Sequence, residues 1–505
     1  MIIRLREELE KIIQEGARRS SSYPDDDSFK AAINGIINTY KNRSLHAIQG
    51  PPGTGKTEVA LRAFEGIHDY MDKGEVVVYV APTHELGVEF LKRIVGTMIS
   101  WGYDMKQILN EIRIYGSKYD YGGGYEELQK TPGRDTRLII TTEYQRIPFD
   151  SRVNALHMII DEASRMPIHS PLRPVVIPIR NALDEGKELH GSLSVLGDPM
   201  QAIMVEPGFR RHLMLTTILC IERQRLEQGY KCPTETERVK ELINWAKRSN
   251  IGFFKFLNIT KRIPSPLHEP ISYGYYDSDL SAWQQVGEKL RGVDLKSLDE
   301  VRTGNPHIDH ASKIIEGAIT TGRGLILVKH TRESYSHGFL FDPQRANAAL
   351  SYGIAIANVT GLSVLITAPY NDMVMQMRLA YRDRYRNYLK RGEIKISTVQ
   401  SVLGGEAEAI VAVLGKEYYP RRRDYRGIET IYETIYFMEP EILNVQMSRE
   451  KTLLAIIGNP SRLAKNARKA DMIKRTTKYR SIYQTMEKLL ELVEQEKGVL
   501  DRVFA

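Results

Sequence analysis

Residues 45–57 read LHAIQGPPGTGKT, a short apolar run that ends in a glycine-rich loop, and the helical pattern TEVALRAFEGIHDYM follows. The loop fills the template G-x-x-x-x-G-K-T with Gly50, Pro51, Pro52, Gly53, Thr54, Gly55, Lys56 and Thr57. Its place between a strand and a helix predicts a P-loop, whose backbone N–H groups surround a chain of phosphates. We expect Lys56 to reach the β and γ oxygens and the Thr57 hydroxyl to bind Mg²⁺.

An acidic pair, Asp161 and Glu162, comes directly after the apolar run LHMII at 156–160. A P-loop that hydrolyses its nucleotide needs a carboxylate for the metal and a group that activates water, both at the end of a neighbouring strand. We therefore expect Asp161 to hold Mg²⁺ and Glu162 to orient and deprotonate the attacking water. Such a pair alone is more often a solvated strand end or a helix cap, but the P-loop upstream favours chemistry.

Short apolar runs alternate with helical patterns along the chain, and they fall into two sets. The first set lies at 45–49, 76–80, 138–142, 156–160 and 193–197, and the second at 324–328, 362–367, 394–398, 409–414 and 453–458. Several runs are apolar throughout, which is typical of parallel strands covered by helices on both faces. The pattern predicts an α/β fold with two tandem sheets.

The length of 505 residues suits two or three domains. We expect an N-terminal helical segment at 1–44, a first domain at 45–225, a second at 226–470 and a C-terminal helix at 471–505. Turn-forming residues predict a loop insertion at about 102–135, and a second insertion is expected at about 277–320.

Composition restricts the class of protein further. Cys220 and Cys232 are too few for a disulfide framework, an iron–sulfur site or a tandem zinc domain, which favours the reducing cytoplasm. No stretch approaches the roughly 20 apolar residues of a membrane span. His157 lies inside an apolar strand and is expected in the core, while His307 and His310 lack metal-ligand spacing.

The positive charge is concentrated in one place. The chain has 71 Lys and Arg against 63 Asp and Glu, a net charge of +8. A basic strip after residue 460 carries eight cations against the single acid Asp471, namely Arg462, Lys465, Arg468, Lys469, Lys474, Arg475, Lys478 and Arg480. The strip, like the basic and aromatic stretch at 418–426, is either a solvated surface or a nucleic-acid contact.

From about Leu45 to Pro460 the order of the motifs resembles superfamily 1 nucleic-acid helicases, in the branch of the nonsense-mediated-decay helicase and senataxin. The matching motifs are IQGPPGTGKT (48–57), DEAS (161–164), GDPMQ (197–201), TVQSVLGGE (398–406) and LNVQMSREK (443–451). The resemblance implies two RecA-like domains, in which Gln201 senses the γ-phosphate and Glu406 contacts the ribose. It makes Arg449 an arginine finger that reaches the γ-phosphate.

A further motif, TKRIP at 260–264, resembles the family's fourth motif and makes Arg262 a second finger. A competing match, QGYKCP at 228–233, lacks the arginine. Lys261 stands where the branch usually has a tyrosine that stacks on adenine, so selectivity for adenine stays open. Weaker matches at strand ends are implied to line the track of a single strand, and they contain Pro82, Thr83, Thr141, Thr142, Pro369, Tyr370 and Thr398.

The resemblance implies an ATP- and Mg²⁺-dependent helicase that moves 5′→3′ on single-stranded DNA or RNA as a monomeric motor. One alternative is a translocase or remodelling ATPase that separates no duplex. Another is a nucleotide-gated clamp that hydrolyses slowly, against which the set of Lys56, Asp161, Glu162, Gln201 and Arg449 argues.

Overall fold

The computed structural model describes most of the chain. The described residues are 26–116, 128, 131–149, 153–166, 170–186, 188–201, 213–233, 235–330, 341–401, 406–417, 421–423, 429–431, 436 and 439–502. Part of the predicted N-terminal segment, residues 117–127 and 129–130 of the predicted loop at 102–135, most of the stretch 418–426 and residues 402–405 lie outside this set. The loop prediction was wrong at the start of 102–135, where Met105–Glu111 forms a helix and Ile112–Ile114 forms a strand.

The chain forms two compact units. Unit 1 comprises Met1–Pro51, Gly55–Thr234 and Glu241–Leu257, and unit 2 comprises Pro52–Thr54, Glu235–Lys240 and Asn258–Ala505. Helix α8 (Thr236–Arg248) therefore has its first turn in unit 2 and its later turns in unit 1. The predicted border at 225/226 falls at the end of α7 (Met214–Leu226), ahead of this shared helix.

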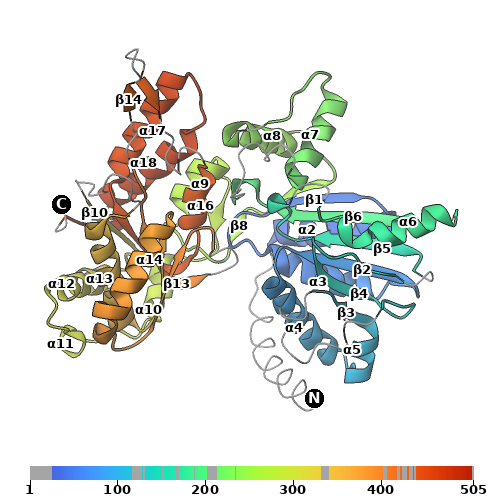
Figure 1. The fold of residues 1–505 in the computed structure, drawn as a ribbon, viewed down its shortest axis with the longest axis horizontal. Coiled ribbons are helices and arrows are strands. Elements are labelled where there is room, and N and C mark those ends of the chain that lie inside the picture. Colours follow the sequence, from blue (N-terminus) through green and yellow to red (C-terminus); the bar gives the residue numbers. More distant parts are fainter. Residues whose placement is uncertain are drawn as a thin grey trace. The chain divides into compact units, whose positions relative to one another are not determined.

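Unit 1 is built on a parallel sheet of seven strands in the order β3-β4-β2-β5-β6-β1-β7 (Figure 1). The strands are β1 (Leu45–Gln49), β2 (Glu75–Ala81), β3 (Ile112–Ile114), β4 (Leu138–Thr142), β5 (Ala155–Ile160), β6 (His190–Gly197) and β7 (Phe254–Phe256). Besides α7 and α8, the helices are α2 (Asp27–Asn42), α3 (Lys56–His68), α4 (His84–Ser100), α5 (Met105–Glu111) and α6 (Val176–Asp184).

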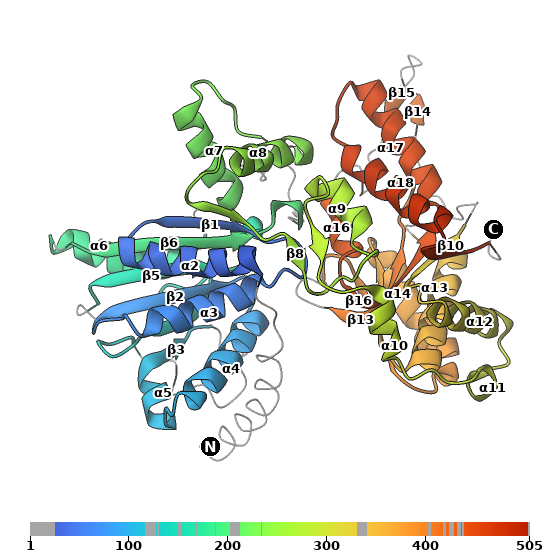
Figure 2. The same ribbon diagram turned by 180° about the vertical axis from the view of Figure 1, so that it is seen from behind.

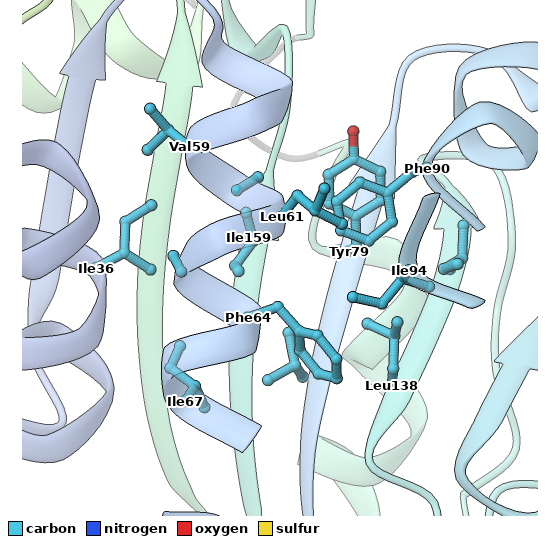
Figure 3. Close-up of a cluster of buried hydrophobic side chains, with 14 of the residues drawn as sticks. Ile36, Val59, Leu61, Phe64, Ile67, Tyr79, Phe90, Ile94, Leu138 and Ile159 are labelled. Atoms are coloured by element: carbon cyan, nitrogen blue, oxygen red, sulfur yellow. The ribbon is translucent and has the colours of Figure 1, made fainter. Parts of the chain in front are cut away.

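The core of unit 1 lies between this sheet and helices α2, α3 and α4 (Figure 3). Ile36, Phe64 and Ile94 come from the three helices and meet Tyr79 of β2 in one buried cluster. The ring of Tyr79 stacks on Phe90 with centroids 3.8 Å apart. Because strand β2 is buried along its whole length, it holds the neighbouring strand ends at fixed positions.

Unit 2 has a parallel sheet of six strands in the order β12-β11-β13-β16-β10-β17. These strands are β10 (Leu325–Lys329), β11 (Ser363–Ala368), β12 (Glu393–Thr398), β13 (Ala407–Val413), β16 (Glu450–Gly458) and β17 (Gly498–Asp501). Two short pairs accompany it, parallel β8 (Ile259–Thr260) with β9 (Ser281–Ala282) and antiparallel β14 (Arg421–Arg423) with β15 (Glu429–Ile431).

Helices α10, α12, α13, α14 and α18 contact this sheet, and α13 lies along it (Figure 2) with most of its side chains buried. The helices are α9 (Glu269–Tyr276), α10 (Val286–Arg291), α11 (Leu298–Val301), α12 (Pro306–Thr320), α13 (Pro343–Thr360), α14 (Asn371–Ala380), α16 (Glu441–Gln446), α17 (Pro460–Lys474) and α18 (Arg480–Glu494). Two parallel sheets covered by helices confirm the predicted α/β fold with tandem RecA-like domains.

The predicted C-terminal helix was wrong over its last residues. Helix α18 ends at Glu494, and Gly498–Asp501 forms β17, which pairs parallel with β10. Four residues are too few to show the alternation of a strand, so the helix prediction was extended over them. Strands β3 and β7, of three residues each, escaped the search for apolar runs for the same reason.

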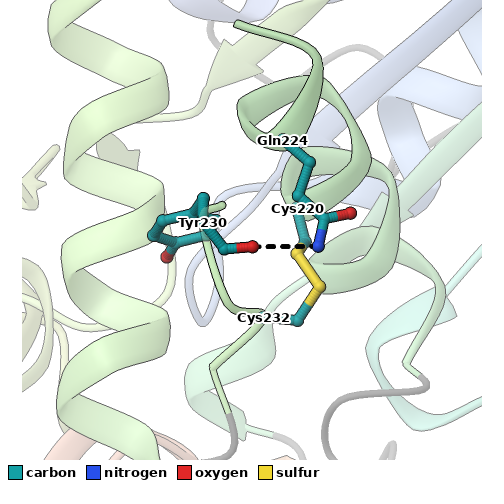
Figure 4. Close-up of a disulfide and its surroundings, with 4 residues drawn as sticks. All are labelled: Cys220, Gln224, Tyr230 and Cys232. Carbon is teal, nitrogen blue, oxygen red and sulfur yellow. Dashed lines mark hydrogen bonds between the residues drawn. A yellow bond between two sulfur atoms is a disulfide. The ribbon is translucent and has the colours of Figure 1, made fainter. Parts of the chain in front are cut away.

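The two cysteines form a disulfide between α7 and the segment before α8 (Figure 4). Cys220 and Cys232 have Cα atoms 5.5 Å apart. Between them, Gln224 Nε2 donates to the Tyr230 carbonyl oxygen at 3.0 Å, and Arg223 lies over the Tyr230 ring. The chain therefore folds back after α7 and brings the sulfurs together, a local return that the cysteine count did not anticipate.

No helix among the described residues is long and apolar enough to cross a lipid bilayer. His157 is buried as expected, and burial lowers its pKa to about 3 while its ring lies 2.6 Å from Ser192 Oγ.

Candidate active site

The P-loop connects the end of β1 to the start of α3. Gly53 and Gly55 have φ angles of +70° and +89°, a region in which residues with a Cβ are strained. The side chain of Lys56 is buried along the loop, and its Nζ donates to the Gly50 carbonyl oxygen at 2.8 Å. The loop therefore combines a tightly curved backbone with one buried cation, the arrangement that a phosphate chain requires.

The acidic pair lies beside this loop, at the carboxyl end of β5. Thr57 Oγ1 donates to Asp161 Oδ2 at 2.7 Å, and the Tyr79 hydroxyl donates to the same oxygen at 2.8 Å. Glu162 Oε1 lies 3.4 Å from Lys56 Nζ. Five side chains from β2, β5 and the P-loop thus form one connected cluster within unit 1.

Burial, followed by the charge of Glu162, raises the pKa of the Asp161 carboxyl. Burial and Asp161 raise the pKa of Tyr79 well above its usual value, so the phenol stays protonated and donates its hydrogen. Two adjacent carboxyl groups with little water around them favour a cation, which offsets their charge. The oxygens of Thr57 and Asp161 are the ligand type that Mg²⁺ prefers, so these residues fit that ion.

The carboxyl end of β6 brings a further acid to the P-loop, because β6 is the neighbour of β1 in the sheet. Asp198 is fully buried and accepts hydrogen bonds from Gln49 Nε2 at 3.1 Å and Gln201 Nε2 at 2.7 Å. Gly197 lies so close to Ser164 that an added Cβ would be 2.7 Å from the Ser164 nitrogen. The Gly-Asp pair of the third motif therefore positions Gln201.

Unit 2 contains a second charged cluster, in which Arg262 is the central cation. Its guanidinium Nε and Nη2 each lie 2.9 Å from Glu406 Oε2, and Nη1 donates to the Ser448 carbonyl oxygen at 3.4 Å. Lys451 forms an ion pair with the other oxygen of Glu406. Burial alone would raise the pKa of Glu406, but Arg262 and Lys451 lower it, so the carboxylate stays charged.

Residues 52–54, at the tip of the P-loop, belong to unit 2. The backbone N–H of Lys261 donates to the Gly53 carbonyl oxygen at 2.8 Å. Lys289 Nζ donates to the carbonyl oxygen of Arg262 at 2.7 Å, and burial lowers the pKa of Lys289 to about 8. The fourth-motif segment is therefore fixed on both sides by hydrogen bonds to its backbone.

Arg449 lies directly before β16 and is buried, as is Glu450 after it. The Arg449 carbonyl oxygen accepts the N–H of Ala407, which joins the sixth motif to the strand that follows Glu406. Burial raises the pKa of Glu450 to about 8, so this carboxyl group is mostly protonated at neutral pH. The cations of the cluster therefore face one charged acid, Glu406, rather than two.

The residues expected along a nucleic-acid track follow the carboxyl ends of strands in both units. Thr83 caps α4 by accepting the Leu86 N–H at 3.4 Å, and the side chains of Thr141 and Thr142 are buried. In unit 2, Pro369 and Tyr370 follow β11 and Thr398 ends β12; all three are buried. If these buried residues contact a single-stranded nucleic acid, they would do so mainly through their backbone groups.

Tyr79, Lys289 and Lys451 were not singled out from the sequence, although each contacts a residue that was. Tyr79 had a detectable signal, because a tyrosine stands alone in the aliphatic run VVVYV. Lys451 lay inside the quoted motif LNVQMSREK but was given no role, and Lys289 had no signal, because nothing in the 27 positions between it and Arg262 shows that the two meet. Among the described residues no group of histidine, cysteine and acidic side chains forms a metal-binding cluster of three.

Comparison with known proteins gives a matching family for the region that carries the P-loop and the acidic pair. Residues 30–187 match the DEAD/DEAH box helicase family. The chain is also 21% identical over 468 residues to the putative helicase MOV-10 of Gallus gallus, a match that covers 86% of this chain and 44% of that protein. These findings confirm the predicted likeness to helicases.

Two further relatives match shorter regions. The general transcription and DNA repair factor IIH helicase subunit XPD of Dictyostelium discoideum is 26% identical over 201 residues, 37% of this chain and 24% of that protein. The replicase polyprotein 1ab of Breda virus 1 is 22% identical over 206 residues, 39% of this chain and 2% of that protein. The chain spans less than half the length of each of these relatives.

Proposed function

We propose that this chain is a helicase that translocates 5′→3′ on single-stranded nucleic acid and couples ATP hydrolysis to strand separation. The observation that carries the proposal is the cluster at the P-loop, where Thr57 contacts Asp161 and Lys56 contacts Glu162. The groups that we propose to bind phosphate, hold the metal and activate water therefore lie in one set, joined by a hydrogen bond and an ion pair. The helicase relatives support a nucleic acid as the partner.

In this proposal, Lys56 and the amides of the P-loop bind the triphosphate, and Thr57 and Asp161 hold Mg²⁺. Bound Mg²⁺ neutralises charge on the phosphate oxygens. The ion pair between Lys56 and Glu162 suggests how the base becomes active. When the γ-phosphate takes Lys56 as its partner, Glu162 loses a cation and is available to accept a proton from the attacking water. Gln201, positioned by Asp198, reports the γ-phosphate to the rest of the unit.

Arg262 and Arg449 of unit 2 are proposed to stabilise the charge that develops on the γ-phosphoryl oxygens. An arginine in this role typically accelerates hydrolysis by about 10³–10⁵. Arg262 pairs with Glu406, so it must exchange a carboxylate for a phosphate. Because the nucleotide would contact residues of both units, its binding and release would shift their relative position. The residues at the carboxyl ends of the β-strands in each unit would bind the single-stranded nucleic acid alternately. This alternation would move the protein along it.

The test is strand displacement on partial duplexes with a single-stranded tail at either the 5′ or the 3′ end, in DNA and in RNA. We expect ATP-dependent displacement of the duplex that carries a 5′ tail and little displacement with a 3′ tail. Stimulation of ATP hydrolysis without displacement would identify a translocase or remodelling ATPase instead. Binding that depends on nucleotide but shows no stimulated turnover would identify a clamp.

A further inference from the structure

The eight cations of the basic strip are not equivalent in the structure. Arg462 lies 3.8 Å from Glu417, and Arg468 forms two contacts of 2.6 Å with the carboxylate of Glu487. Lys474 donates to the Tyr479 hydroxyl at 2.9 Å, and Lys478 lies 5.3 Å from the centre of the same ring. Arg480 hydrogen-bonds to Tyr483. Five of the eight cations therefore have structural partners.

The other three cations, Lys465, Lys469 and Arg475, are exposed. Within the described part of the chain they form no ion pair. Lys465 and Lys469 are one helical turn apart on α17, on the face opposite to the buried Leu463, Ala467 and Ala470. The helix thus has one apolar face, packed against α18 (Figure 1), and one cationic face exposed to solvent.

Two large apolar side chains lie at the end of this cationic face. Met472 is 79% exposed and Ile473 is 50% exposed. Met472 follows Lys465 and Lys469 by two turns and one turn, so the three share one side of the helix. Two adjacent exposed apolar side chains beside cations give this side of the helix both apolar and charged groups that a partner can contact. We call Lys465, Lys469, Met472, Ile473 and Arg475 the α17 tip.

The α17 tip is held rigidly, which a binding surface requires. The Asp471 side chain is buried and accepts the N–H of Tyr479 at 3.0 Å, and its carbonyl oxygen accepts the N–H of Thr476 at 3.0 Å. Arg475 ends the helix in the left-handed conformation, with a φ angle of +50°. The turn from α17 to α18 is therefore fixed by backbone hydrogen bonds at the point where the apolar pair projects.

We infer that the α17 tip binds the duplex part of the nucleic acid on which the proposed motor acts. The inference rests on the proposed function. Three cations within three helical turns suit the phosphates of a duplex, which carries one charge per about 1.7 Å of its axis. Methionine and isoleucine are among the side chains that proteins insert against base steps in the minor groove. A surface of this kind holds a duplex without reading its sequence, as a motor needs.

The test is the salt dependence of binding to a blunt duplex by the intact chain, compared with the triple variant Lys465→Ala, Lys469→Ala and Arg475→Ala. Each lost phosphate contact reduces the slope of log K against log salt by about 0.9. Between 50 and 200 mM salt, the wild type should therefore lose roughly 40-fold more affinity than the variant. The double variant Met472→Ser and Ile473→Ser should weaken binding without changing the slope.

A matched control neutralises three exposed cations of unit 2 on other elements, Lys313, Arg384 and Lys395. The control should keep the wild-type slope. An equal slope for wild type and the α17 variant, or an equal loss in the control, would overturn the inference. The inference would also be overturned if the α17 variant lost binding to vesicles of phosphatidylserine and phosphatidylcholine while its binding to the duplex stayed unchanged. Basal ATP hydrolysis should be the same in all variants, and its absence from the wild type would reject the proposed function instead.

Discussion

In unit 1 the acids Asp161 and Glu162 face a threonine and a lysine of the P-loop, whereas in unit 2 the cations Arg262 and Lys451 face the acid Glu406. In the first cluster the residues proposed to bind phosphate and metal are in contact with each other. The second holds its cations on a carboxylate of its own unit. Under the proposed function, unit 1 would bind the nucleotide, and unit 2 would supply charge that becomes available only when a phosphate competes with Glu406 for it.

The largest effect is expected from removing a cation of unit 2. Arg449→Ala should lower kcat for ATP hydrolysis by about 10³–10⁵, because the charge that develops on the γ-phosphoryl group loses its partner. The affinity of unit 1 for the nucleotide should change little, and a titration with labelled ADP measures this affinity. Arg384→Ala, at an exposed site of the same unit, is the control. An Arg449→Ala variant with near-normal kcat would remove unit 2 from the chemistry.

The next effect concerns Glu162, the proposed base in unit 1. Glu162→Gln keeps the shape of the side chain but cannot accept a proton, so turnover should fall by about 10²–10⁴. ATP should still bind, since Lys56 and the P-loop are unchanged, and equilibrium binding of labelled ATP checks this. Retained turnover would show that another group activates the water.

A smaller effect is expected from reducing the disulfide, which should change the stability of unit 1 but not that of unit 2. The disulfide lies in unit 1 and closes a loop of about a dozen residues, so reducing it should cost roughly 3 kcal/mol in the chain-entropy account. The reductant should therefore lower the midpoint temperature of the unfolding transition of unit 1 and leave that of unit 2 unchanged. Calorimetry with and without the reductant measures both transitions. The double variant Cys220→Ala and Cys232→Ala should be insensitive to the reductant. A shift of both transitions would show that the units unfold together.

The smallest effect is a pH dependence in unit 2. Burial raises the pKa of Glu450 to about 8 from an ordinary value of 4.5, so the folded state binds a proton that the unfolded state has released. The stability from this group is complete below pH 4.5 and is lost as the pH rises through 8. Between pH 6 and 8 the loss is on the order of 2 kcal/mol.

Glu450→Gln cannot ionise, so denaturant unfolding of this variant should lose less stability than the wild type over the same pH range. The two proteins should be closest in stability at the acid end. Parallel curves for the two would mean that Glu450 is charged in the folded state, and the cluster of unit 2 would then hold two acids rather than one.

Sequence reasoning recovered the parts of the site that are written in local patterns. The P-loop, the acidic pair and the Gly-Asp of the third motif each need specific residue types within a few positions, because one turn between a strand and a helix creates the geometry. The order of ten apolar runs also gave both sheets. Each of the three motifs lies within a single connection between a strand and the helix that follows it, so its geometry is set by neighbouring residues.

The features that escaped the sequence depend on contacts between distant residues or on very short elements. Arg262 and Glu406 are 144 positions apart, and nothing near either residue shows that they pair. The partner of Cys220 depends on how the chain returns after α7, and β17 depends on an edge left open beside β10. Tertiary packing decides such contacts, so a local pattern cannot contain them.

The most direct test of the account measures steady-state ATP hydrolysis while single-stranded DNA or RNA is titrated into the intact chain. Turnover should rise to saturation with at least one of the two nucleic acids. Glu162→Gln and Arg449→Ala, one from each unit, should each abolish the stimulated rate. Turnover that is indifferent to both nucleic acids, or that survives either substitution, would contradict a motor whose chemistry needs both units.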